Sequence, residues 1–194
     1  MNVITAGAAF IALWGLVILN STLKVTQTSA NTAHDALVQT QRAWVQITAD
    51  FSPALKDIKE VTYRMKLANV GNTPAKRIDV RNIVRLVKSD EPPPFSVTSM
   101  GFGIEAKVIF PKADTSYPVS LVRPDNSIAI LTPTERGDLE NGKSYIAIYG
   151  SAVYEDEFGF HWTHFCFWKG YANGIYASEA CVSYNDVGEG KNPY

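Results

Sequence analysis

The stretch from Ser144 to Gly170 constrains the fold most, because it holds two long apolar runs separated by a short polar turn. Residues 145–154 and 160–168 are rich in aromatic and β-branched side chains, which favour strands. The five residues between them, 155–159, end in Gly159 and predict the loop of a β-hairpin. Both faces of each run are largely apolar, a pattern typical of central strands that are covered on two sides.

Shorter apolar runs recur along residues 42–184. In residues 61–67, apolar and charged side chains alternate, as in a sheet with one buried face. Pro133–Glu140 instead follows Thr132 with a proline in the first turn, which predicts a helix. The other expected strands are residues 43–48, 77–87, 102–110 (which also fits a short helix), 119–122, 127–131 and 180–184. We therefore expect an antiparallel immunoglobulin-like β-sandwich over residues 42–184 and a flexible tail over residues 185–194.

The N-terminal segment is apolar and of a different kind. Val3 to Leu19 contains seventeen residues without a charge, and Leu23 extends the apolar run before Lys24. A helix from Val3 to Leu23 is about 31 Å long, enough for the hydrocarbon core of a bilayer. The alternative is a cleaved secretory signal, but a basic start and a small-residue cleavage site are both missing. We expect residues 1–23 to form a transmembrane helix.

Small residues in this segment suggest a contact between membrane helices. Ala8, Ala12 and Gly15 would let a second helix approach closely, although glycine and alanine are common in membrane helices in any case. Residues 24–41 are polar, lack proline and glycine, and predict a helical stalk. The seven-residue spacing of apolar residues in the stalk suits only weak self-association.

Charge and cysteine content exclude several classes of protein. The chain has 18 Lys and Arg residues against 19 Asp and Glu residues, so it lacks the basic excess of a nucleic-acid-binding protein. Two cysteines are too few for a disulfide scaffold or for a structural zinc site by themselves. No nucleophile elbow, phosphate loop or metal-ligand spacing stands out, so we expect no catalytic residues, no cofactor, no small-molecule substrate and no enzymatic activity.

Four short segments support a resemblance to known sequences. They are Gln41-Arg42-Ala43-Trp44-Val45, Asn69-x-Gly71-x-Thr73-Pro74-Ala75, Gly150-x3-Tyr154-x-Asp156-x-Phe158-Gly159 and Thr163-x-Phe165-Cys166. Together they resemble a family of bacterial single-pass membrane-anchored proteins whose function is uncharacterised. The resemblance spans nearly the whole chain and implies an N-terminal anchor, a helical stalk and a β domain, without known catalytic residues.

Cys166 and Cys181 are expected to form a disulfide, because the glycine-containing segment between them can bring Cys181 back beside Cys166. Two buried free thiols are the alternative. A metal or redox site is a further alternative, since His164 and Cys166 are two apart in a strand and project from the same face. His161 projects from the opposite face and does not join them.

The hairpin also carries an acidic tip and many aromatic side chains. Glu155 to Glu157 predict a solvated tip rather than a carboxylate pair, with Asp156 capping turn amides. Phe165, Phe167 and Trp168 occupy both faces of a strand, so both faces need a cover, either from this chain or from a partner protein. These three residues are the expected partner contacts of the β domain.

These features predict a non-enzymatic, membrane-anchored accessory or scaffolding subunit of a membrane protein complex. The alternative is a periplasmic metal-binding or redox protein that uses Cys166 and His164. Lipid and membrane-protein partners are expected for the anchor, and no nucleic acid. For location we expect the inner membrane with the β domain in the periplasm, because a cysteine pair suits an oxidising compartment, although Lys24 favours the cytoplasmic side.

Overall fold

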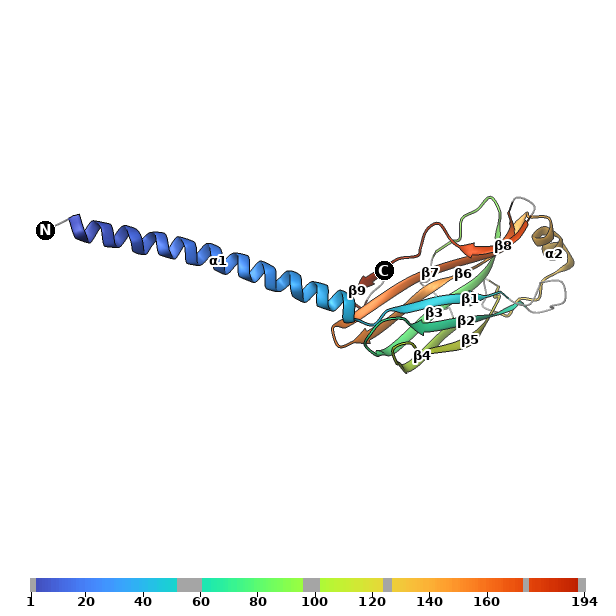
Figure 1. Cartoon of the computed structure of the whole chain (residues 1–194). Helices are drawn as coiled ribbons and strands as arrows, with labels where there is room; N and C mark the ends of the chain where they lie inside the picture. Colours follow the sequence, from blue (N-terminus) through green and yellow to red (C-terminus); the bar gives the residue numbers. More distant parts are fainter. Residues whose placement is uncertain (1–2, 52–60, 96–101, 124–126, 173–174, 192–194) are drawn as a thin grey trace. The chain divides into compact units, whose positions relative to one another are not determined.

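The computed structural model describes residues 3–51, 61–95, 102–123, 127–172 and 175–191 (Figure 1). For residues 3–13, 102, 172, 175 and 176 it describes the backbone without the side chains. The chain divides into two compact units, Met1–Gln41 and Arg42–Tyr194, at the boundary that the sequence predicts.

The first unit is one helix, α1, which runs from Val3 to Gln41 without a break. The expected membrane and stalk segments are therefore parts of the same helix. Along its polar part, the hydroxyls of Thr22, Thr26 and Thr28 donate to the carbonyl four residues earlier at 2.8–2.9 Å.

No helix among the residues with described side chains is both long and apolar enough to cross a membrane. Most of the expected span, including Ala8 and Ala12, lies outside those residues. Gly15 lies inside them at a half-exposed position, where an added Cβ would meet no side chain of a described residue within 4 Å.

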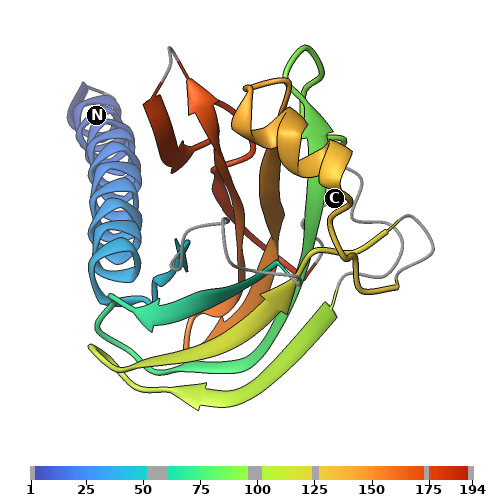
Figure 2. The same cartoon turned by 90° about the vertical axis from the view of Figure 1, so that its right-hand side faces the viewer.

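The second unit contains two antiparallel sheets. The smaller sheet has the order β1-β2-β5, formed by Val45–Asp50, Thr62–Asn69 and Asp114–Ser120. The larger sheet has the order β4-β3-β6-β7-β8, and β9 also pairs with β7. Its strands are Phe102–Ile109 (β4), Ala75–Lys88 (β3), Ser144–Asp156 (β6), Gly159–Ala172 (β7), Ile175–Ala180 (β8) and Val187–Glu189 (β9). Figure 2 shows the two sheets as separate layers.

The main core lies between the sheets, because alternate residues of each strand point inward. Met65 and Leu67 of β2 and Ile146 and Ile148 of β6 have no exposed surface and belong to one cluster. Alternation places Ala147 and Tyr149 on the other face of β6, within a second buried cluster. The expectation that this strand is covered on both faces is therefore confirmed.

Two irregular segments of this chain cover part of the outer face of the larger sheet. Phe95, which follows the proline run, stacks on Tyr184 with ring centroids 4.7 Å apart, and it meets Tyr149 edge-on at 5.8 Å. Tyr184 follows the disulfide-bonded Cys181 and joins the same cluster. The aromatic excess of the hairpin is thus partly explained by cover from within the chain.

The helix predicted over Pro133–Glu140 is confirmed as α2, which lies against β6 and β7 (Figure 2). Thr132 is its N-cap and its hydroxyl accepts from Glu135 N at 3.2 Å. The Glu135 carboxylate in turn accepts from Thr132 N at 2.8 Å. This capping box satisfies two backbone donors that the helix start would otherwise leave unpaired.

Several predicted boundaries are wrong. The hairpin pairs up to Asp156 and Gly159, so two residues rather than five form its turn. The strand expected at 180–184 lies earlier, as β8, and residues 127–131 form isolated bridges rather than a strand, among them Val122 to Ile128. The predicted flexible tail contains β9, because the N-terminal part of β7 offers a free edge that Val187–Glu189 occupies.

The disulfide between Cys166 and Cys181 is present, with the two Cα atoms 5.3 Å apart. It joins β7 to the segment after β8, and Cys181 N also donates to the Cys166 carbonyl at 2.9 Å. The bridge therefore ties the cover of the outer face to the strand beneath it.

Reduction of this disulfide is expected to lower the free energy of unfolding by about 3 kcal/mol, because it releases a loop of 15 residues in the unfolded chain. Urea denaturation with and without a reductant measures the difference. The double variant Cys166→Ala, Cys181→Ala is the control and should not respond to the reductant. An equal stability of oxidised and reduced wild type would contradict the prediction.

Candidate functional site

The buried carboxylate of Asp156 links several of the sequence segments on which the resemblance rests. Its side chain accepts hydrogen bonds from Ala43 N at 2.8 Å, from Phe158 N at 2.8 Å and from His161 Nε2 at 2.9 Å. Asp156 is 5% exposed and His161 is 2% exposed. The start of the β domain is therefore bonded to the tip of its longest hairpin, 113 residues later.

These hydrogen bonds decide the charge state of the carboxyl group. Burial alone would raise the pKa of Asp156, but the hydrogen bonds from Ala43, His161 and Phe158 outweigh it and hold the pKa below its usual value. The predicted role of Asp156 as a turn cap is confirmed through Phe158. The prediction of a fully solvated acidic tip is wrong for this residue, because its carboxylate turns inward to these donors.

Asn69 completes the same junction from the turn after β2. Its side-chain oxygen accepts from Gly71 N at 3.0 Å and Trp44 N at 3.3 Å. Its amide nitrogen donates to the carbonyls of Thr73 at 2.7 Å and Ile109 at 3.0 Å. All four positions of the amide are thus used.

Glycine is required at position 71 because the junction leaves no room for a side chain. A Cβ at this position would lie 2.3 Å from the Arg42 carbonyl oxygen, well inside van der Waals contact. The Arg42, Asn69 and Asp156 segments therefore meet in one structural junction. The side chains of Asn69 and Asp156 hydrogen-bond backbone groups of this junction.

The residues of the alternative metal site have other partners. The sulfur of Cys166 is bonded to Cys181, so it is not a thiolate ligand in this form. His164 Nδ1 lies 2.8 Å from Asp186 Oδ1, and its ring stacks on Tyr184 with centroids 4.5 Å apart. Within the described ranges, no group of three or more His, Cys, Asp or Glu residues is arranged to hold a metal ion.

The expected partner contacts of the β domain differ in exposure. Phe165 is 2% exposed and belongs to the core between the sheets, so its assignment to a partner surface is wrong. Phe167 is half-buried against the same core. Trp168 projects from the opposite face of β7, is half-buried and lines a hollow of about 390 Å³ with Tyr145 and other residues.

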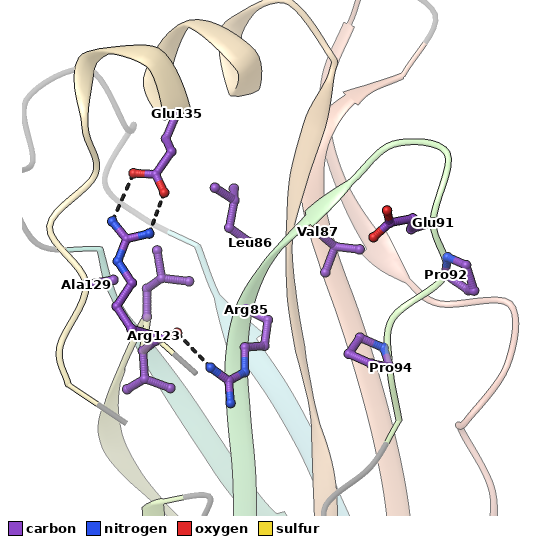
Figure 3. Close-up of a pocket in the computed structure, with 11 residues that line it drawn as sticks. Arg85, Leu86, Val87, Glu91, Pro92, Pro94, Arg123, Ala129 and Glu135 are labelled. Carbon is purple, nitrogen blue, oxygen red and sulfur yellow. Dashed lines mark hydrogen bonds and ion pairs between the residues drawn. The ribbon is translucent and has the colours of Figure 1, made fainter. Parts of the chain in front are cut away.

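A second hollow, of about 360 Å³, contains the charged groups of most chemical interest (Figure 3). It lies beside the C-terminal half of β3, between the segment Leu121–Arg123 and the proline run. Its lining residues are Arg85, Leu86, Val87, Glu91, Pro92, Pro94, Leu121, Val122, Arg123, Ala129 and Glu135. Most of these side chains are apolar, and the charges come from two arginines and two glutamates.

One of the two arginines is neutralised within the pocket. Arg123 and Glu135 form a paired contact through both carboxylate oxygens, as Figure 3 shows, and Arg123 Nη2 lies 3.0 Å from Glu135 Oε2. The Arg123 guanidinium and the bonds from Thr132 lower the pKa of Glu135 to about 2. Glu135 therefore stays ionised, and the pair joins α2 to the pocket wall.

Arg85 is held differently. It is half-buried on the outer face of β3, between the buried Ile83 and Val87. Its Nη1 donates to the Val122 carbonyl at 3.1 Å, and its guanidinium also hydrogen-bonds the side chain of Tyr149. The ion pairs of the described residues include none that joins Arg85 to a carboxylate.

Sequence reasoning missed this pocket. The available signal is that Arg85 alternates with Ile83 and Val87 on a face that proves to be buried. A charged residue between two buried neighbours needs a partner, and the alternation alone does not tell where that partner lies.

Comparisons with known proteins add little to this geometry. No protein-family model matches the chain, and no curated protein sequence matches it. A solved structure described as "X-ray structure of Northeast Structural Genomics Consortium target SoR45" aligns with 81% of this chain and 90% of its own chain. The identity is 12% and the TM-score is 0.27, so this likeness carries no argument about fold or function.

Replacement of Asp156 by Asn is expected to lower the free energy of unfolding by about 1–3 kcal/mol at pH 7, because one of its charged acceptor oxygens becomes an amide nitrogen. The lowered pKa of Asp156 means that its contribution is present above the usual Asp pKa of about 4 and is lost as the pH falls through the lower folded value. The difference between wild type and variant should therefore shrink below pH 4.

Chemical denaturation between pH 2 and pH 8 measures this difference. Glu157→Gln, which changes an exposed neighbour, is the control and should stay within about 0.5 kcal/mol of wild type. If the free energy of unfolding differs between wild type and Asp156→Asn by the same amount over the whole pH range, the charge of Asp156 does not contribute to stability.

Proposed function

We propose that this protein is a non-enzymatic, membrane-anchored accessory or scaffolding subunit of a membrane protein complex. Residues 1–23 would supply the anchor, which the uncharged run from Val3 to Leu19 supports. Ala8, Ala12 and Gly15 would let a partner helix approach it closely. Residues 24–41 would carry the β domain away from the bilayer as a continuous helix.

We further propose that the β domain is immunoglobulin-like. In support, β1, β2 and β5 form one sheet, while β3, β6 and β7 form the centre of the other. This matches the split of an immunoglobulin sandwich into A-B-E and C-F-G strands, with β4 on the edge of the second sheet. In such domains, binding residues lie disproportionately on loops that a rigid scaffold positions.

The observation that carries the proposal is an exposed apolar surface held next to the disulfide. Val182 directly follows Cys181 and is fully exposed, and Tyr171 is 39% exposed. Both line the hollow that also contains Trp168, Pro92 and Pro93. Aromatic side chains on a rigid, partly open surface are typical of protein-binding sites. Trp168 therefore remains a partner contact in this proposal.

For location we propose the inner membrane, with the β domain in the periplasm. The support is the disulfide, because such bridges persist in oxidising compartments. Trapping of the thiols in intact cells tests the location. A fully oxidised pair is expected, and a reduced pair would favour the cytoplasm.

The partner is tested by purification of the full-length chain from its native membranes in mild detergent. A membrane protein is expected to co-purify with wild type and to be lost with Val182→Asp, which places a charge on the exposed apolar surface. Val70→Asp is the matched control, because Val70 is 59% exposed in the turn after β2. Recovery of the wild-type chain alone, or equal recovery of the partner with both variants, would contradict the proposal.

A further inference from the structure

The pocket beside β3 lies where that strand loses one of its neighbours. β4 pairs with β3 only as far as Asn82. From Ile83 to Lys88, β3 pairs with β6 on one side. In the described part of the chain, the other side receives two backbone bonds, from Val122 N to the Val84 carbonyl at 3.2 Å and from Glu91 N to the Lys88 carbonyl at 3.0 Å. Leu86 lies between these two acceptors.

The backbone of Leu86 faces this open side. In an antiparallel pair, residues two apart direct their N–H and C=O groups to the same side. Val84 directs its carbonyl away from β6 to Val122, so Leu86 also directs its N–H and C=O away from β6. Leu86 is among the lining residues of the pocket, and its N–H and C=O are the backbone donor and acceptor on this open side.

Arg85 adds a charge beside this backbone that no ion pair among the described residues neutralises. Its described hydrogen bonds go to the Val122 carbonyl and the Tyr149 side chain, whereas a guanidinium has five N–H donors in a planar fork. Figure 3 shows Arg85 between the Arg123–Glu135 pair and Pro94. Because Glu135 already neutralises Arg123, Arg85 is the cation with donors left for an anion.

We propose that this pocket binds a carboxylate that has an amide N–H beside it, which is the chemistry of an N-acylated amino acid or of a peptide C-terminus. The carboxylate accepts from Arg85 and from Leu86 N–H. The amide N–H donates to the Leu86 carbonyl, a contact that a simple carboxylic acid does not supply. This combines strand addition at a free edge with capture of a terminal carboxylate.

The other walls fit the rest of such a ligand. Pro92, Pro94, Leu121 and Ala129 present apolar surface that suits an aliphatic side chain and excludes water from the charged contact. The volume of about 360 Å³ accommodates one amino-acid residue with its acyl group. The preferred ligand is thus expected to end in an apolar residue.

Isothermal titration of the full-length chain in detergent micelles tests the site. N-acetyl-leucine is expected to bind at least tenfold more tightly than N-acetyl-leucinamide, which has the same shape without the carboxylate. This comparison needs no variant of the protein. Equal affinity for the two compounds, or no binding of N-acetyl-leucine, would overturn the proposal.

Variants then assign the binding to Arg85. Arg85→Gln is expected to lower the affinity for N-acetyl-leucine at least tenfold. Arg64→Gln removes the same charge from an exposed position on β2 and should bind as wild type. Thermal unfolding of each variant shows whether it is folded. Wild-type affinity in folded Arg85→Gln would overturn the assignment.

Ligands of different length distinguish a protein C-terminus from a small acylated amino acid as the source of the carboxylate. If the site takes the C-terminus of a protein, acetyl-Ala-Ala-Leu should bind more tightly than N-acetyl-leucine, because its two further residues add contacts with the pocket walls. Equal affinity of the two acids would assign the site to small acylated amino acids and reject the peptide. These titrations use no membrane partner, so their failure leaves the accessory-subunit proposal untouched.

Discussion

The buried carboxylate of Asp156 is the interaction on which the rest of the β domain depends. A charge with 5% exposure is costly unless it is fully hydrogen-bonded, and here the Ala43 amide, the Phe158 amide and His161 meet that demand. The same bonds join the entry to β1 with the tip of β6 and β7. The first residues of the β domain are therefore fixed to the tip of its longest hairpin.

The second constraint is that the central strands of the larger sheet need a cover on both faces. The smaller sheet covers one face, and Phe95 and Tyr184 cover part of the other. The disulfide at Cys181 holds one of these covering segments against β7. Both hollows of interest lie where this cover ends, one beside Trp168 and one beside Arg85. Both proposed binding surfaces thus lie where the cover of the larger sheet is incomplete.

Sequence reasoning succeeds where the signal is local. The hairpin strands, α2 and the pairing of Cys166 with Cys181 each follow from neighbouring residues, through alternation, a cap or a flexible loop. It fails where a distant strand decides the outcome. Val187–Glu189 has no alternation of its own and becomes β9 because β7 has a free edge. Phe165 and Trp168 are equivalent in the pattern, and only the position of the smaller sheet separates core from surface. The pocket around Arg85 is not predicted, because a sequence shows a charged residue but not which groups lie beside it in the fold.

Native-state hydrogen exchange at the Ala43 amide tests the central role of Asp156 most directly. Ala43 precedes β1 and lies outside any strand, so Asp156 is the acceptor described for its N–H. If the junction unfolds only with the whole domain, this amide should exchange as slowly as the amides of Ile146 and Ile148 in the core of β6. Exchange at the rate of a solvent-exposed amide, with β6 still protected, would show that the junction opens on its own and would contradict this account.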